Sequence, residues 1–153
     1  MTTMKTMDPY EVLKLKNQLC FPLYATAKEV VKRYRPYLDD VDLTYTQYIV
    51  MMVAWEKGTV SVKELGESLF LDSGTLTPVL KSLEQKGFVK RERNASDERV
   101  LDVSLTEQGV RLKDRALSVP EKMAGCVCLT AEESAELYRI LYKLLRSWYS
   151  EGD

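Results

Sequence analysis

The 153-residue sequence contains no histidine and only three cysteines, Cys20, Cys126 and Cys128. Without imidazole the chain has no cysteine–histidine nucleophile pair and lacks a ligand of most zinc sites. The Cys-X-Cys pair is typical of some thiolate metal sites, but three thiols without histidine make such a site incomplete. An odd number of cysteines also argues against a disulfide framework. We therefore expect no metal, no cofactor and no catalytic group, and any cysteine chemistry must proceed without histidine.

The sequence also lacks a long hydrophobic run and an excess of one charge. No stretch of about 18 uncharged apolar residues occurs and the N-terminus has no signal-peptide core, so we expect a cytoplasmic protein without a membrane partner. The 22 basic and 23 acidic residues give a net charge of −1, which argues against broad non-specific binding of nucleic acid. Hydrophobic residues make up 45% of the chain, enough for one domain, residues 1–153, with a real core.

The segment Leu71–Arg99 is the most informative stretch that is present. A polar, glycine-containing helix start precedes an apolar-periodic helix that closes at Lys86-Gly87. Two short β-like runs, Phe88–Glu92 and Arg99–Ser104, then surround a charged turn. This order predicts a helix followed by a winged hairpin, although a solvated turn after an ordinary surface helix remains the alternative.

Short hydroxyl side chains and cations in this segment are suited to phosphates and base edges in a major groove. Residues 81–99 hold six basic and four acidic side chains, so the local excess of positive charge is only +2. The candidate DNA-binding residues are Ser73, Thr75, Thr77, Lys81, Arg91, Arg93, Asp97 and Arg99.

Helix signals precede this segment. Apolar residues recur at helical spacing over residues 9–38; we expect Pro22 to bend or restart that helix beside Cys20, and Pro36 to end it. Two capping boxes, Thr44–Gln47 and Ser61–Glu64, open short helices. With the helix after Asp72 they form a helix-turn-helix unit.

One proline disagrees with the start of that third helix. If Asp72 caps it, Pro78 falls in the second turn and deletes a backbone hydrogen bond. The helix therefore either starts nearer Gly74 or bends at the proline, and the sequence leaves both alternatives open.

Two further helices follow the wing. Thr106 caps a helix that we expect to run to about Val119, where Pro120 breaks it, and the capping box Thr130–Glu133 opens a C-terminal helix with a wide apolar stripe. The predicted fold is mainly α with a small β-hairpin wing: a winged helix-turn-helix over about 44–105, flanked by dimerisation helices over about 9–38 and 107–150. The terminal helices expose more apolar surface than the central unit can cover, so we expect a homodimer; a monomer that packs its own termini together is the alternative.

The stretch Asp72–Pro78, the wing tip Asp97-Glu98-Arg99 and the junction Leu105–Gly109 resemble the MarR family of dimeric transcription repressors. Within that family, Asn17–Phe21, Tyr34 and Leu43–Tyr48 resemble the organic-hydroperoxide sensor OhrR and its staphylococcal relatives SarZ and MgrA. The resemblance covers the chain from about Leu15 to Trp148.

The resemblance implies that an organic hydroperoxide oxidises Cys20, and that hydroxyls matching Tyr34 and Tyr45, from the partner subunit, hydrogen-bond to it. Helical geometry agrees, because Cys20 and Tyr34 are 14 residues apart on one predicted helix, or about 21 Å when it is straight. Hydroxyl donors favour the reactive thiolate over the thiol, and the first product is a sulfenic acid that thiols reverse. A Cys20 that packs as a small buried hydrophobe is the alternative.

The resemblance leaves the second step open. Some family members carry a C-terminal cysteine that resolves the sulfenic acid as an intersubunit disulfide, whereas others use a small thiol. Cys126 and Cys128 are both candidates, and neighbours two apart in a loop or strand point in opposite directions, so at most one readily faces the partner's Cys20. Resolving partner and bystander remain equal alternatives.

The family implies a repressor that binds a near-palindromic double-stranded operator when reduced and releases it when Cys20 is oxidised. The helix near Ser73–Lys81 would enter the major groove, and Arg99, held by Asp97, would reach a minor groove. One alternative is a MarR-type repressor that responds to a small aromatic or anionic ligand, with Cys20 not the sensor. A thiol peroxidase is disfavoured, because no threonine or proline with a paired arginine surrounds Cys20, and we expect no enzyme.

Overall fold

The computed structural model describes residues 8–149. Two short 3-10 helices, η1 (Pro9–Leu13) and η2 (Leu15–Asn17), precede the regular elements. These are α1 (Cys20–Asp39), α2 (Tyr45–Lys57), β1 (Thr59–Ser61), α3 (Val62–Leu69), α4 (Ser73–Gln85), β2 (Val89–Arg93), β3 (Leu101–Leu105), α5 (Glu107–Ala116), α6 (Ser118–Ala124) and α7 (Ala131–Tyr149). The predicted mainly helical fold with a small β-wing is confirmed.

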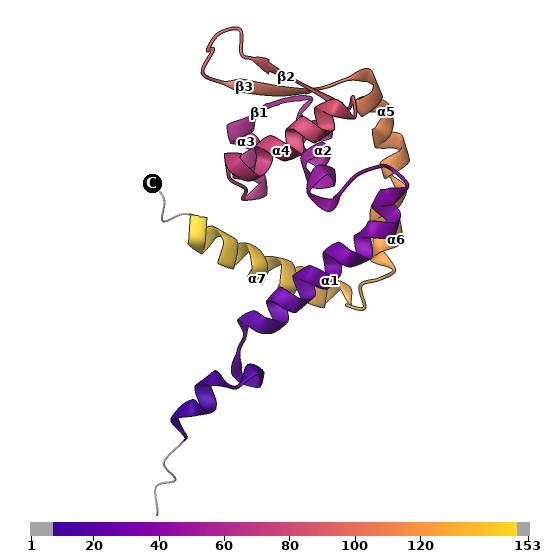
Figure 1. Cartoon of the computed structure of the whole chain (residues 1–153). Helices are drawn as coiled ribbons and strands as arrows, with labels where there is room; N and C mark the ends of the chain where they lie inside the picture. The colour runs from indigo at the N-terminus through magenta and orange to yellow at the C-terminus, as the bar shows by residue number, and fades with distance from the viewer. Residues whose placement is uncertain (1–7, 150–153) are drawn as a thin grey trace, which may run out of the picture.

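Helices α2, α3 and α4 form the helix-turn-helix, and the hairpin β2–β3 projects beyond it as a wing (Figure 1). The hairpin is antiparallel, with Arg91 opposite Val103. Strand β1 pairs with the other side of β3, with Val60 opposite Val103, so the sheet order is β1-β3-β2. Strand β1 was not predicted from the sequence, because three residues carry too little alternation to mark a strand.

Local capping fixes the ends of these helices. Thr44 and Gln47 form the predicted capping box of α2, and Ser61 and Glu64 form that of α3. At its C-terminal end α2 stops at Gly58, whose φ of 76° is in the left-handed region that favours glycine. Residues close in sequence thus determine where the helices of the helix-turn-helix begin and end.

The prolines behave differently from the expectation. Helix α1 restarts at Cys20 as predicted, with Pro22 in its first turn, where its missing N–H has no helical partner to lose. The prediction that Pro36 ends this helix is wrong, because α1 continues to Asp39. Lys32 and Pro36 are both exposed, so water can satisfy the carbonyl that the proline leaves without a donor.

Two other proline predictions are resolved by the structure. Asp72 caps α4, which begins at Ser73 and contains Pro78, so the start nearer Gly74 is wrong. The break predicted at Pro120 instead falls at Leu117, and Pro120 occupies the first turn of the separate helix α6. In both helices the proline is exposed or near the start, where it disturbs packing least.

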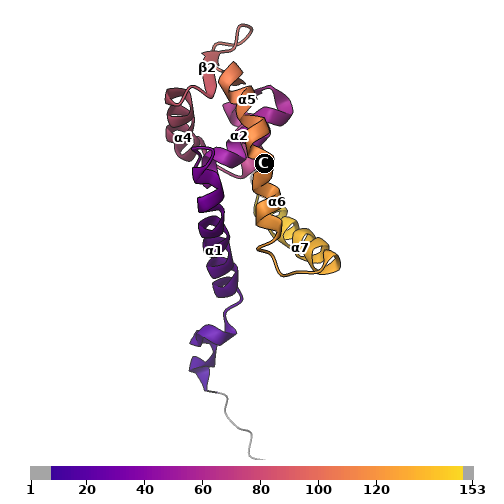
Figure 2. The same cartoon turned by 90° about the vertical axis from the view of Figure 1, so that its right-hand side faces the viewer.

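The hydrophobic core lies under the helix-turn-helix and reaches the C-terminal end of α1 and helices α5 and α6. Its fully buried members include Leu38, Met51, Leu65, Leu76, Leu80, Leu83, Val103 and Val119. By contrast, η1, η2 and most of α1 extend away from this core. Helix α7 has no buried residue, although its C-terminal end contacts Phe70, and Figure 2 shows α1 and α7 on different sides. None of the described helices is long and apolar enough to cross a membrane.

We predict that Gly109→Ala destabilises the fold. A Cβ at Gly109 would lie 2.0 Å from the Phe88 backbone oxygen, and the Gly109 carbonyl accepts a hydrogen bond from the Trp55 ring nitrogen at 2.8 Å. We expect the free energy of unfolding to fall by about 3 kcal/mol, because backbone must move. Chemical denaturation measures it.

Gly125→Ala is the matched control. A Cβ there would lie 3.6 Å from the nearest oxygen, which is ordinary contact. Equal stability of the two variants would contradict the close approach at Gly109.

Candidate DNA-reading surface and thiol site

The outer face of α4 carries the predicted reading residues. Ser73, Thr75, Thr77 and Lys81 are exposed, whereas Leu76, Leu80 and Leu83 on the opposite face are buried. The helix is therefore amphipathic, with a polar stripe free to meet another molecule. This arrangement is what a helix needs to enter a major groove with its N-terminal half.

Hydrogen bonds hold two of these hydroxyls in place. The Asp72 carboxylate accepts from the Thr75 backbone N–H at 2.7 Å and from the Thr75 hydroxyl at 3.3 Å. These hydrogen bonds, the backbone one foremost, hold the pKa of Asp72 below its ordinary value. The Thr77 hydroxyl donates to the Ser73 carbonyl at 2.7 Å, which leaves its oxygen able to accept from a base or a bound water.

Arg91 joins the wing to the reading helix. Its Nε and Nη2 donate to Glu84 Oε2 at 3.1 and 2.9 Å, and its backbone N–H donates to Glu84 Oε1 at 3.0 Å. The guanidinium lowers the pKa of the Glu84 carboxyl. From the sequence, Arg91 was predicted only as a DNA contact, and the role of Glu84 was not predicted. An acidic residue on α4, a few positions before a basic strand, could have indicated this pair.

The wing tip is built around Asp97 and Asn94. Arg99 donates to both Asp97 oxygens, at 3.0 and 3.1 Å, as the family resemblance implied. This pairing holds the pKa of Asp97 below its ordinary value. Asn94, missed from sequence, accepts from the Ser96 and Asp97 backbone N–H groups and donates to Asp102. The Arg99 side chain is 91% exposed, while Arg93 is also exposed on β2.

Tyr34 and Tyr45 come together although they lie on different helices. Tyr34 on α1 and Tyr45 on α2 have ring centroids 4.9 Å apart, and Tyr48 lies 6.0 Å from Tyr34. All three are at least half-buried against the core. Burial raises the pKa of Tyr34 and of Tyr45. Both phenols therefore stay protonated, and so remain hydrogen-bond donors, at neutral pH.

Cys20 lies far from this tyrosine pair in the same chain. It begins α1 and is exposed, with Leu19 beside it 82% exposed. Tyr34 follows 14 residues later on the same uninterrupted helix, which corresponds to about 21 Å. One chain thus holds both halves of the predicted thiol site but does not bring them together.

The C-terminal cysteines differ from each other. Cys126 is half-buried, and its Sγ lies 3.5 Å from the Tyr37 hydroxyl on α1. The hydrogen bond with Cys126 raises the pKa of Tyr37. Cys128 is exposed. Tyr37 was not predicted from the sequence; its position one helical turn beyond Tyr34 could have indicated it.

Among the residues that the structure describes, no group of histidine, cysteine or carboxylate side chains is placed to hold a metal.

The comparisons with known proteins agree with this geometry. The family model of the transcriptional regulators SarA/Rot matches residues 27–116. The organic hydroperoxide resistance transcriptional regulator of Bacillus subtilis is 44% identical over 145 residues, which are 95% of this chain and 99% of that protein. The HTH-type transcriptional regulator SarZ of Staphylococcus aureus is 42% identical, over 91% of this chain and 94% of that protein.

A solved structure shows the same fold. Reduced AbfR bound to DNA has a TM-score of 0.76 and 34% identity, covering 94% of this chain and 98% of that chain. The resemblance that the sequence motifs carried is therefore confirmed. This chain belongs to the MarR family of winged-helix, DNA-binding transcriptional regulators, in the group of the SarA/Rot, SarZ and organic-hydroperoxide-resistance regulators.

Proposed function

We propose that this protein is a homodimeric repressor that binds a near-palindromic operator when reduced and releases it when an organic hydroperoxide oxidises Cys20. The observation that carries the proposal is the division of the thiol site. Tyr34 and Tyr45 are assembled at 4.9 Å, whereas Cys20 is about 21 Å from Tyr34 along α1. A second copy, with its α1 crossing the first, supplies the missing half.

Exposed apolar side chains support the second copy. They gather on the N-terminal elements and on α7, away from the core. Among them are Leu13, Leu15, Leu19, Phe21, Tyr24, Leu137, Tyr138, Ile140 and Trp148. A monomer rarely leaves so much apolar surface in water. In a symmetric dimer the N-terminal elements and α7 of one copy pack against the N-terminal elements and α7 of the other copy, which buries these side chains.

The oxidation step is simple thiol chemistry. The Cys20 thiolate attacks the terminal oxygen of the hydroperoxide, and the O–O bond breaks. The alkoxide leaves and takes up a proton to become an alcohol, so the peroxide is reduced while Cys20 becomes a sulfenic acid. The tyrosine hydroxyls stabilise the thiolate before the step. The Bacillus subtilis relative is an organic hydroperoxide resistance regulator, which supports this choice of oxidant.

The position of Cys126 favours it over Cys128 as the resolving thiol. Cys126 contacts Tyr37, which lies one helical turn beyond Tyr34. If the partner's Cys20 meets Tyr34, it also comes close to Cys126. The Cys126 sulfur then attacks the sulfenic sulfur, an S–S bond forms between subunits, and water leaves.

A pocket beside Tyr45 supports the second candidate function. It has a volume of about 450 Å³ and is lined by Lys28, Lys32 and Arg35 of α1 together with Val31 and Leu43. Three cations against the one carboxylate of Asp39, together with an apolar floor, suit a small aromatic anion. A rise in the thermal midpoint of Cys20→Ser with benzoate, and release of DNA by benzoate, would favour that function.

Oxidation should release wild-type protein from DNA but leave Cys20→Ser bound. The probe is a duplex that the wild-type protein selects from a random library, and the oxidant is one equivalent of cumene hydroperoxide. We expect affinity of the wild type to fall about 100-fold, because the two reading heads no longer fit both half-sites. A gel-shift titration measures it. Cys128→Ser is the control and should respond like wild type; equal release of Cys20→Ser would refute the proposal.

Mass spectrometry identifies the resolving thiol. After one equivalent of hydroperoxide we expect a peptide pair joining Cys20 to Cys126. Cys128→Ser should form the same linked dimer, whereas Cys126→Ser should stop at the sulfenic acid or its adduct with a small thiol. A Cys20–Cys128 link in wild type would show that Cys126 is the bystander.

Arg99→Ala should weaken DNA binding without changing stability. Its side chain is 91% exposed and bonds only to the neighbouring Asp97 in the described residues. Loss of a minor-groove or phosphate contact should reduce operator affinity about tenfold. Arg111→Ala, an exposed arginine on α5 paired with Glu107, is the control. The wing-tip role is wrong if both variants bind equally well in a fluorescence-anisotropy titration.

A further inference from the structure

The turn between α3 and α4 holds an unusual residue. Phe70 ends α3 with φ 54° and ψ 42°, in the left-handed region. Residues with a Cβ rarely adopt this conformation, and glycine is the usual choice at such a position. A bulky aromatic side chain here requires contacts that hold it.

The turn is also very tight. The backbone N–H groups of Phe70 and Leu71 both reach the Gly66 carbonyl, the latter at 3.0 Å. A Cβ on Gly66 would lie 2.6 Å from the Leu71 oxygen. Helix α3 and the start of α4 are therefore joined closely, so a shift at Phe70 is passed on to Asp72 and the first turn of α4.

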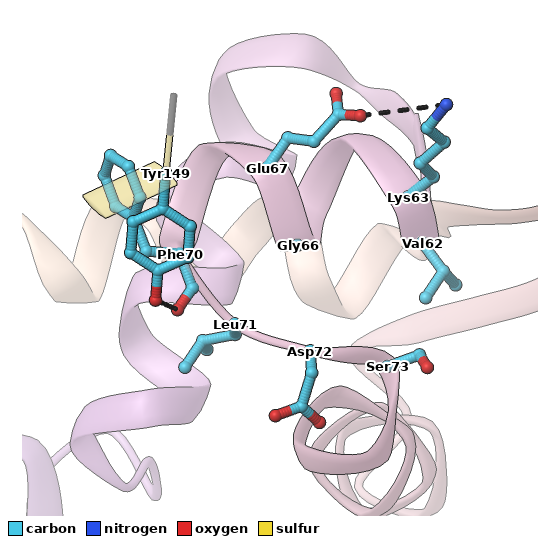
Figure 3. A pocket seen from close by; sticks show the side chains of 9 residues that line it. All are labelled: Val62, Lys63, Gly66, Glu67, Phe70, Leu71, Asp72, Ser73 and Tyr149. Carbon is cyan, nitrogen blue, oxygen red and sulfur yellow. Dashed lines mark hydrogen bonds and ion pairs between the residues drawn. The ribbon is translucent and has the colours of Figure 1, made fainter. Parts of the chain in front are cut away.

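The C-terminal end of α7 contacts this turn from outside the helix-turn-helix. The Tyr149 hydroxyl donates to the Phe70 carbonyl at 3.1 Å, and the two ring centroids are 4.9 Å apart at an interplanar angle of 56°. Figure 3 shows Tyr149 beside Phe70 at one end of a pocket whose other end is formed by Val62 and Lys63. One side chain of α7 thus holds both the backbone and the ring of the left-handed residue.

The pocket behind this contact leaves the turn room to move. It has a volume of about 710 Å³ and is lined by α3, the turn, the start of α4 and Tyr149. Leu71 packs against the hydrophobic core, whereas Phe70 and Tyr149 are not among the core residues. The Tyr149 contact can therefore open without breaking the hydrophobic core.

We propose that Tyr149 is a positioning residue that ties α7 to the helix-turn-helix at Phe70, so that the placement of α7 sets the placement of the reading helix α4. This inference rests on the proposed dimeric function, in which α7 forms part of the dimer interface. Helix α7 has 19 residues, a length of about 28 Å. Its first residue, Ala131, follows Cys126 by five positions, and its last residue, Tyr149, contacts Phe70. In the proposed function, α7 therefore links the region of the thiol site to the turn before the reading helix.

The first experiment tests the contact without DNA. Hydrogen exchange is compared between wild type, Tyr149→Phe and Tyr149→Ala. We expect the Leu71 and Thr75 amides to exchange about tenfold faster in the alanine variant and less so in the phenylalanine variant, which keeps the ring. Ser147→Ala removes a hydroxyl from the same helix, one that donates to the Leu144 carbonyl within α7, and should exchange like wild type. Unchanged exchange at the turn in Tyr149→Ala overturns the inference.

The second experiment tests positioning. A selected operator is compared with one whose half-sites are moved apart by inserted base pairs, and with a single half-site. We expect Tyr149→Ala to lose about tenfold of the preference for correct spacing, and Tyr149→Phe about threefold. Half-site binding and the thermal midpoint should stay near wild type.

The outcomes separate this inference from the proposed function. Equal weakening on all three duplexes would show that Tyr149 only supports the fold, and would overturn the inference. A wild-type protein without any spacing preference overturns the dimeric function, and the inference with it. Wild-type preference kept in Tyr149→Ala overturns the inference alone.

Discussion

The constraint on which the proposed switch depends is the fixed rise of an α-helix. Helix α1 is uninterrupted from Cys20 to Asp39, so its length separates Cys20 from Tyr34 by about 21 Å. No side-chain rotation spans that distance. Cys20 therefore lies at one end of this helix and Tyr34 near the other, and in the proposed dimer a crossing copy of the helix brings the two together. In the proposed function, oxidation sensing by Cys20 therefore requires the dimer.

A small number of polar contacts around the hydrophobic core hold α4 and the wing, the candidate DNA-reading surface, in place. Asp72 starts α4, the Glu84–Arg91 pair fixes β2 to that helix, and Asn94 shapes the wing tip. Exposed ion pairs contribute little to stability on their own, but these are short and mostly multidentate, so they define orientation. Such orientation matters for the proposed dimer, in which two reading helices must match two half-sites at a fixed spacing.

The termini bring these two parts together. The end of α1 packs near α6, and Tyr37 reaches Cys126 just before α7 begins. At the other end of α7, Tyr149 reaches Phe70 in the turn that precedes α4. In the proposed function, α7 therefore lies between Cys126 and the turn that precedes the reading helix. These packed contacts offer a physical route by which the proposed oxidation could bias the position of α4.

The sequence by itself determined whatever depends on neighbours three or four residues apart. The capping boxes at Thr44, Ser61 and Thr130 and the glycine stops set helix ends correctly, because their hydrogen bonds close within one turn. Pro36 and Pro120 were misread because exposure and position in the first turn, which follow from packing, decide what a proline costs. Only the tertiary structure brought Tyr34 to Tyr45, Glu84 to the wing and Tyr149 to Phe70, since these contacts join residues on different elements, and the relative placement of those elements is set by tertiary packing.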